Sequence, residues 1–217
     1  TAVDNTVRTE QDALDATELG LVTASSYSHL PTLIEYDRGL VALGMQRTNP
    51  TLMPLGLPSA PGAATALSLS AKAFSITLND GGTSGLAALG LGARALAAGR
   101  AQACVVAGAF TPFAELLQSA SRAGLTASAE RFRVLDRDAA GMAFGEAAAA
   151  LVLEPAERAR KRGRASLGVV RGDASRFSAH PAGLSGALAR ASAAALKGSR
   201  LAPERLALAC VGASGIP

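Results

Sequence analysis

The sequence predicts an α/β protein with a largely buried sheet. Short apolar runs alternate with segments of helical periodicity along all 217 residues, which is the pattern of strands joined by helical connections. Hydrophobic residues make up 49% of the chain and charged residues 18%, a balance that argues against disorder. A chain of this length and composition can bury a sizeable core.

The predicted elements follow in order along the chain. Apolar runs of strand length are Leu19–Ala24, Phe74–Leu78, Cys104–Ala107, Ala148–Leu153, Leu167–Arg171 and Leu206–Val211. Helix formers at i, i+3, i+4 spacing fill the segments between them, which are His29–Leu43, Ala63–Lys72, Ser84–Ala98, Pro112–Arg122, Pro155–Arg162 and Leu184–Leu196. Pro112 and Pro155 fall in first helical turns, where no backbone N–H is needed. Small Ala and Gly residues dominate these helices and allow close packing on a sheet.

Two stretches interrupt this alternation. Thr48–Pro61 contains four prolines and is predicted to be a long ordered loop or a surface arm. Ala127–Gly145 is a second long connection, rich in arginine and aspartate. Neither stretch has the composition of a low-complexity linker.

Composition excludes several classes of function. No apolar run approaches the roughly 18 residues of a membrane span, and the first residues carry no export pattern, so we expect a cytoplasmic protein without a membrane segment. Cys104 and Cys210 lie in apolar runs with only two histidines in the chain, so we expect no disulfide framework, metal or cofactor. The net charge is +4, but aromatic residues are 4% with no Trp, which favours an acidic protein partner over nucleic acid.

A loose dinucleotide pattern, G-x-G-x-x-A, spans Gly90 to Ala95. It falls within a predicted helix rather than at a turn between a strand and a helix, where backbone amides would face a pyrophosphate. We therefore interpret it as close helix packing.

The most informative segment joins the predicted strand Phe74–Leu78 to the helix that begins at Ser84. Between them, Asn79 to Thr83 form a sharp glycine-rich turn. Such a turn places one side chain at the positive end of the helix dipole, which suits a thiolate or an oxyanion. The segment thus has the geometry of a nucleophile elbow.

Several motifs together resemble the β-ketoacyl synthases of the thiolase superfamily. Gly82-Thr83-Ser84-Gly85 occupies the family's Cys-x-Ser-Gly elbow, and Arg133 to Glu146 is similar to its Arg-Pro-Phe-Asp…Gly-Glu stretch. Further similarities cover Leu33–Pro54, Ala103–Pro112 and Leu151–Glu154, the last at the distance that the family has from Glu146. The resemblance implies a thiolase-like layered αβα fold, approximately the N-terminal half of a ketosynthase, as a single domain over residues 1–217.

Departures from the family suggest the function. Gly82 stands at the position of the acyl-accepting cysteine and Ala213 at that of the first catalytic histidine, while the position of the second histidine falls beyond residue 217. Condensation needs all three groups, so the sequence predicts a subunit that is non-catalytic by itself. The resemblance implies a chain-length-factor-like partner of a full-length β-ketoacyl synthase and an acyl carrier protein, in type II polyketide or aryl polyene biosynthesis.

The resemblance also implies roles for individual residues. Leu33, Ile34, Leu52 and Met53 are expected to project into the partner's acyl tunnel, with Asp80, Thr83 and Ser84 at the same interface. A basic cluster is either a solvated helix end or a docking site for an acidic carrier protein, and consists of Arg158, Arg160, Lys161 and Arg162. Glu146 is expected to be a structural anion that ties the long connection to the core.

Two other functions stay open. One is a stand-alone thioester hydrolase or acyltransferase that uses Ser84 with His180, although Ser84 is expected mainly to cap its helix through backbone hydrogen bonds. The other is a priming subunit that decarboxylates a malonyl group bound at the elbow amides.

Overall fold

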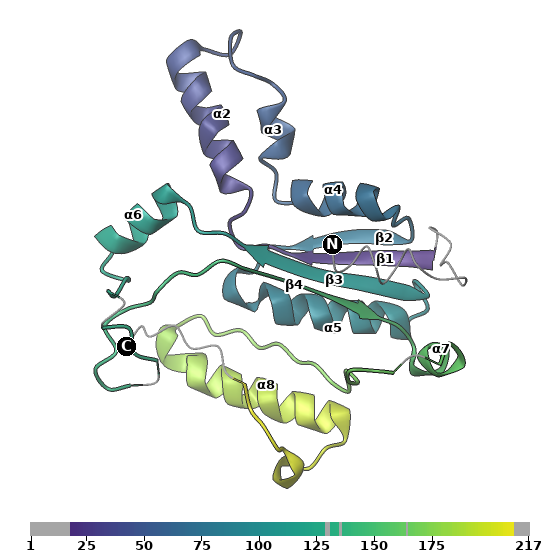
Figure 1. Ribbon diagram of the computed structural model, residues 1–217. Coiled ribbons are helices and arrows are strands. Elements are labelled where there is room, and N and C mark those ends of the chain that lie inside the picture. Colours follow the sequence, from purple (N-terminus) through teal and green to yellow (C-terminus); the bar gives the residue numbers. More distant parts are fainter. Residues whose placement is uncertain (1–17, 129–130, 135, 164, 211–217) are drawn as a thin grey trace. The chain divides into compact units, whose positions relative to one another are not determined.

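The computed structural model describes residues 18–128, 131–134, 136–163 and 165–210. Its sheet contains β1 (Leu19–Ala24), β2 (Phe74–Leu78), β3 (Ala103–Phe110) and β4 (Ala147–Leu153), in the order β2-β1-β3-β4 (Figure 1). β1 pairs in parallel with both β2 and β3. The predicted α/β fold is therefore confirmed, and the first four predicted strands agree with the observed ones within three residues at each end.

β1 is the central strand of the core because its side chains are buried on both faces of the sheet. Val22 and Ala24 pack with Ala88 of α5 (Ser84–Ala97), whereas Leu19 and Leu21 pack with residues of α4 (Ala60–Leu69). Alternate residues of a strand point to opposite faces, so α4 and α5 cover opposite faces of the sheet (Figure 1). This arrangement is the layered αβα architecture that the resemblance implied.

The remaining helices are α2 (Leu30–Leu43), α3 (Leu52–Leu55), α6 (Ala114–Arg122), α7 (Ala156–Lys161) and α8 (Leu184–Ser199). The predicted proline-rich loop Thr48–Pro61 is partly helical, which corrects the prediction. It contains the single helical turn of α3 and the start of α4. Pro61 lies in the first turn of α4, where its missing N–H leaves no hydrogen bond unmade.

The predictions of strands at Leu167–Arg171 and Leu206–Val211 are wrong for the residues that the structure describes. Residues 165–180 and 206–210 belong to no strand, and Val211 lies outside the described part of the chain. A strand needs a neighbouring strand to receive its backbone hydrogen bonds, and neither segment has one among the described residues. Their apolar patterns therefore indicate only that strand formation is possible.

The chain divides into two compact units, Thr1–Gly108 with Ala149–Arg205 and Ala109–Ala148 with Leu206–Pro217. Within the second unit, the rings of Phe110 and Phe144 lie 6.2 Å apart, and Thr111 Oγ1 donates a hydrogen bond to Glu146 Oε1 at 2.9 Å. Glu146 thus connects the end of the long connection to Thr111 just after β3, and the tie to the core that we expected stays a prediction.

The described residues contain no helix that is both long and apolar enough to cross a membrane. In the same residues, no three side chains of the His, Cys, Asp or Glu type gather closely enough to hold a metal ion.

The close approach of α5 to the sheet gives a stability prediction. A β-carbon built at Gly92 would lie 2.8 Å from Val106 Cγ2, whereas one at Gly85 would have no heavy atom within 4 Å. Gly92→Ala is expected to destabilise the fold by about 1–3 kcal/mol through overpacking. Gly85→Ala, the matched control on the same helix, is expected to stabilise it by up to about 1 kcal/mol. Urea unfolding measures both, and equal effects would contradict the packing of α5.

Candidate functional site

The candidate site is the turn that connects β2 to α5, at the carboxyl end of the sheet. β2 ends at Leu78, a 3₁₀ turn spans Gly81–Thr83, and α5 begins at Ser84. Gly81 has a φ of 64°, a left-handed conformation that favours glycine. The sharp strand-to-helix turn predicted from the sequence is therefore present.

Ser84 holds this turn together through its hydroxyl. Its Oγ accepts a hydrogen bond from the Asp80 backbone N–H at 2.7 Å and donates one to the Gly81 carbonyl at 2.9 Å. Thr83 is the N-cap residue and makes no side-chain capping bond, so Ser84 acts on the turn before the helix and not as the N-cap that we expected. At 2% exposure, Ser84 is buried, and its hydrogen bonds among the described residues are to the backbone groups of Asp80, Gly81 and Ser25.

The segment after β1 braces the same turn. Ser26 Oγ donates to the Gly81 carbonyl at 2.9 Å, and the Ser25 backbone N–H donates to the Leu78 carbonyl, also at 2.9 Å. Sequence analysis missed both serines. The one sequence feature that could have identified them is their position directly after a buried strand, because the loops that form binding sites in parallel sheets lie at the carboxyl ends of the strands.

Gly82 occupies the centre of the turn and leaves open space. A β-carbon built there would have no heavy atom within 4 Å, and its backbone does not adopt the left-handed conformation of Gly81. A side chain would therefore fit at this position, but none is present.

Asp80 and Thr83 flank Gly82 and are both exposed. The Thr83 hydroxyl donates to the Asp80 carbonyl at 3.0 Å, which closes the turn on its outer side. Ala213, which the resemblance assigns to the position of a catalytic histidine, lies outside the described residues.

His180 does not form a hydrogen bond with Ser84 among the described contacts. It is exposed and precedes the 3₁₀ turn Pro181–Gly183, where its carbonyl accepts a hydrogen bond from the Ser178 hydroxyl at 2.8 Å. The chain's other histidine, His29, is buried before α2, and its Nδ1 has no hydrogen-bond partner among the described residues. Neither imidazole therefore forms, among the described residues, the hydrogen bond to Ser84 that a catalytic base would need.

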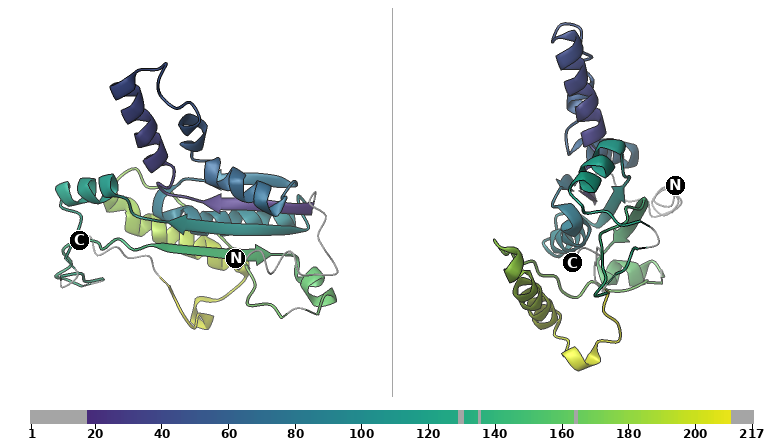
Figure 2. Two further views of the ribbon diagram at one scale, coloured as in Figure 1. Left: turned by 45° about the horizontal axis from the view of Figure 1, so that its top comes forward. Right: turned by 90° about the vertical axis from the view of Figure 1, so that its left-hand side faces the viewer.

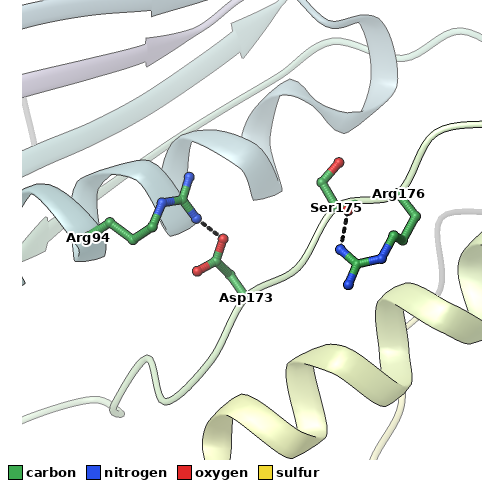
Figure 3. A network of polar contacts seen from close by, with 4 residues as sticks. All are labelled: Arg94, Asp173, Ser175 and Arg176. Carbon is green, nitrogen blue, oxygen red and sulfur yellow. Dashed lines mark hydrogen bonds and ion pairs between the residues drawn. The ribbon is translucent and has the colours of Figure 1, made fainter.

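The G-x-G-x-x-A pattern is helix packing, as the sequence indicated. Gly90 and Gly92 lie inside α5, far from its N-terminus. The Asp173 carboxylate fills the space beside Gly90 and forms an ion pair with Arg94, one turn further along α5 (Figure 3). Since side chains occupy the surface of both glycines, no backbone amide there faces an open site.

The residues assigned to a partner's tunnel lie on two helices that contact each other. Leu33 and Ile34 lie on α2, and Leu52 and Met53 lie on α3. Leu33 packs against Gly56, where a β-carbon would be 3.1 Å from the Leu33 Cα. Of the four, only Met53 is exposed, at 49%. α2 projects beyond the sheet with α3 beside it, and none of its residues is buried (Figures 1 and 2).

The predicted basic cluster at α7 divides into two pairs. Arg158 and Arg162 are half-buried and form ion pairs with Glu154, at 3.5 Å and 3.0 Å. Arg160 and Lys161 are exposed to solvent. Only the second pair presents its charge to an acidic partner, because Glu154 neutralises part of the first.

The comparisons with known proteins identify a family. Residues 5–159 match the family described as "Beta-ketoacyl synthase, N-terminal domain". A search of curated protein sequences finds no significant match.

Solved structures with the same fold are ketosynthase proteins. A β-ketoacyl synthase from Burkholderia phymatum STM815 is 22% identical, with a TM-score of 0.77 over 88% of this chain and 48% of that chain. In AntDE:AntF, a type II PKS acyl-carrier protein in complex with its ketosynthase, the matched chain is 21% identical, with a TM-score of 0.75 over 90% of this chain and 52% of that chain. The ishigamide ketosynthase/chain length factor is 22% identical, with a TM-score of 0.70 over 88% and 49%. This chain therefore spans about half the length of each.

Thiol reactivity gives a prediction for the site. Burial raises the pKa of the Cys104 thiol to about 11, partly offset by a backbone hydrogen bond from Val22, so about one thiol in a thousand is ionised at pH 8. Cys210 is exposed. Iodoacetamide at pH 8 is expected to modify only Cys210 in the folded protein and both cysteines in urea. Rapid modification of Cys104 without denaturant would show that the β1–β3 core opens readily.

Proposed function

The chain belongs to the β-ketoacyl synthase family, and on this basis we propose that it is a non-catalytic, chain-length-factor-like subunit. In this proposal it pairs with an active β-ketoacyl synthase and shapes that enzyme's acyl tunnel in type II polyketide or aryl polyene biosynthesis. The observation that carries the proposal is the elbow: the turn is fully braced, yet Gly82 stands where the resemblance places the nucleophile.

Condensation chemistry explains why this substitution matters. The reaction needs a nucleophile to hold the acyl group, and it needs cationic or hydrogen-bonding groups to stabilise the charge that develops as carbon dioxide leaves. Gly82 supplies no nucleophile, and the resemblance places Ala213 where a catalytic imidazole is required. Ser84 is a poor substitute, because its hydroxyl is buried and bonded to the turn.

The edge of the sheet supports pairing with a second subunit. β2 lies at the end of the sheet order, so one side of this strand has no strand partner among the described residues. An unpaired edge is a template for strand addition from another chain. One of the similar structures is itself a ketosynthase/chain length factor, which is in keeping with such a pairing.

The α2–α3 pair supports a role at the partner's tunnel. Met53 and Val41 expose large apolar side chains on helices that cover no part of the sheet's core. Exposed apolar groups gathered on a projecting pair of helices are typical of a protein interface. Arg160 and Lys161 are a second, separate feature that suits an acidic carrier protein.

A decarboxylating priming subunit is the alternative that the open turn favours. The space at Gly82 could accept a malonyl carboxylate near the N-terminus of α5, where the helix dipole favours negative charge. Release of carbon dioxide from malonyl carrier protein by the isolated chain would support this alternative over a purely structural role.

Co-expression tests the proposal. With a ketosynthase that retains its cysteine, the chain is expected to form a 1:1 complex, measured by analytical ultracentrifugation. Ser75→Lys on β2 is expected to weaken this complex at least tenfold, since lysine on an edge strand blocks strand pairing. Leu67→Lys, at an exposed site on α4, is the control and should leave the complex intact. A chain that stays monomeric at micromolar concentration beside such ketosynthases would overturn the proposal.

Restoring the nucleophile gives a second prediction. Gly82→Cys is expected to fold, because the position is open, and to react with iodoacetamide at the N-terminal end of α5. It is not expected to condense acyl and malonyl groups, because a thiolate alone cannot stabilise the developing enolate. Mass spectrometry follows both reactions. Chain elongation by the isolated variant would mean that the catalytic imidazole positions are not lost.

Product length gives a third prediction. Leu52→Trp and Met53→Trp in the complex are expected to shorten the product. Each buried methylene contributes about 0.8 kcal/mol, so blocking two or three carbons disfavours the longest chain by about 2 kcal/mol, more than tenfold. Arg160→Ala is the control, expected to lower the rate without changing length. An unchanged product profile in an intact complex would show that these residues do not shape the tunnel.

A further inference from the structure

Residues 30–56 form an arm that projects beyond the sheet and contains α2 and α3 (Figures 1 and 2). Neither helix has a buried residue or belongs to the two core clusters. The arm is nevertheless packed internally, since a β-carbon at Gly56 would lie 3.1 Å from Leu33 Cα and the Thr48 hydroxyl donates to the Gly44 carbonyl at 2.9 Å. A displacement of the arm is therefore transmitted to the sheet through the segments at its ends.

The segment at one end of the arm, residues 25–29, joins β1 to α2, and we call it the root. The root is hydrogen-bonded to the elbow turn. The Ser26 hydroxyl donates to the Gly81 carbonyl at 2.9 Å. Oriented with its nitrogen toward the root, the Asn79 side-chain amide donates to the carbonyls of Ser25 at 2.7 Å and Ser26 at 2.8 Å. The start of the arm and the elbow turn are therefore connected by hydrogen bonds in both directions.

The Gly81 carbonyl is the group through which the root acts on position 82. It accepts one hydrogen bond from the Ser26 hydroxyl and one from the Ser84 hydroxyl, each at 2.9 Å, so both of its lone pairs are used. Because a peptide unit is planar, the Gly81 carbonyl and the Gly82 N–H turn together. Gly81, with a φ of 64°, has the backbone freedom to turn when one of these bonds is lost. Ser26 therefore helps to set the direction of the Gly82 N–H.

We propose that Ser26 couples the position of the arm to the orientation of the peptide between Gly81 and Gly82. A contact made on the arm, away from the elbow, then changes the backbone donor at position 82. The coupling runs from the packed arm to the root, and from the root to the turn through the Ser26–Gly81 hydrogen bond. The proposal rests on contacts within this chain and does not depend on the non-catalytic role or on pairing with a ketosynthase.

A double-mutant cycle tests this coupling, with Gly82→Cys as the reporter. Its rate of alkylation by iodoacetamide is followed by peptide mass spectrometry, which separates position 82 from the native cysteines. Gly56→Val displaces α3 from α2, because even a β-carbon there lies 3.1 Å from Leu33 Cα. It is expected to change the alkylation rate by about threefold or more, and to have no effect when Ser26→Ala is also present. A rate that the arm variant leaves unchanged, or a change that persists without the Ser26 hydroxyl, would overturn the proposal.

Two further variants keep the test decisive. Gly39→Ala perturbs the same arm more mildly if Gly56→Val does not fold, since its β-carbon would lie 3.2 Å from Thr48 Cγ2. Gly172→Ala is the matched control, because its β-carbon would lie 2.6 Å from the Ala195 carbonyl oxygen of α8, outside the arm. It is expected to leave the alkylation rate unchanged, and an effect as large as that of the arm variants would overturn the proposal.

Amide hydrogen exchange checks the same hydrogen bond in the turn without a cysteine at position 82. Ser26→Ala is expected to speed exchange in residues 79–84 by about threefold or more, because the Gly81 carbonyl loses one of its donors. Ser59→Ala is the control, since Ser59 is exposed at the other end of the arm and makes no side-chain capping bond. Equal exchange in the two variants would overturn the proposal, whatever the outcome of co-expression with a ketosynthase.

Discussion

The buried hydroxyl of Ser84 is the group on which the geometry of the site depends. Its Oγ accepts a hydrogen bond from the Asp80 N–H and donates one to the Gly81 carbonyl, so it links the turn after β2 to the first residue of α5. A buried hydroxyl without such partners would cost roughly 1–3 kcal/mol. The turn therefore cannot rearrange without also disturbing the start of the helix. α5 in turn lies close on the sheet only because Gly92 leaves room for Val106.

Position 82, in the same turn, has no side chain that contributes to this hydrogen-bonded framework. Gly82 has no neighbour within 4 Å of where its side chain would be, and Gly81 rather than Gly82 supplies the left-handed turn residue. Gly81 thus sets the backbone conformation of this short turn, whereas position 82 has room for a side chain. The side chain at position 82 can therefore change with little effect on the fold.

The sequence predicts the strands that have a pairing partner among the described residues and fails for those that have none. β1 and β2 are found at the predicted residues, because each is an apolar run that pairs within the chain. Residues 167–171 are equally apolar but have no strand beside them, and pattern alone cannot show that. At the site, Gly82 is recognised from family resemblance, whereas the bracing by Ser26 depends on two segments far apart in the chain. Likewise, no sequence pattern reveals that Glu154 forms ion pairs with two of the four basic residues at α7, Arg158 and Arg162.

The two edges of the sheet differ in a way that bears on assembly. At the β2 edge, Phe74 is half-buried over Gly20 and the Arg100 guanidinium lies 5.1 Å from its ring centroid. At the other edge, Ala147 to Val152 of β4 are exposed although all are apolar. Burying that apolar surface is favourable at about 25 cal/mol per Å². β1, paired on both sides, holds the fold together, whereas β4 at the other edge keeps an apolar strand exposed among the residues that the structure describes.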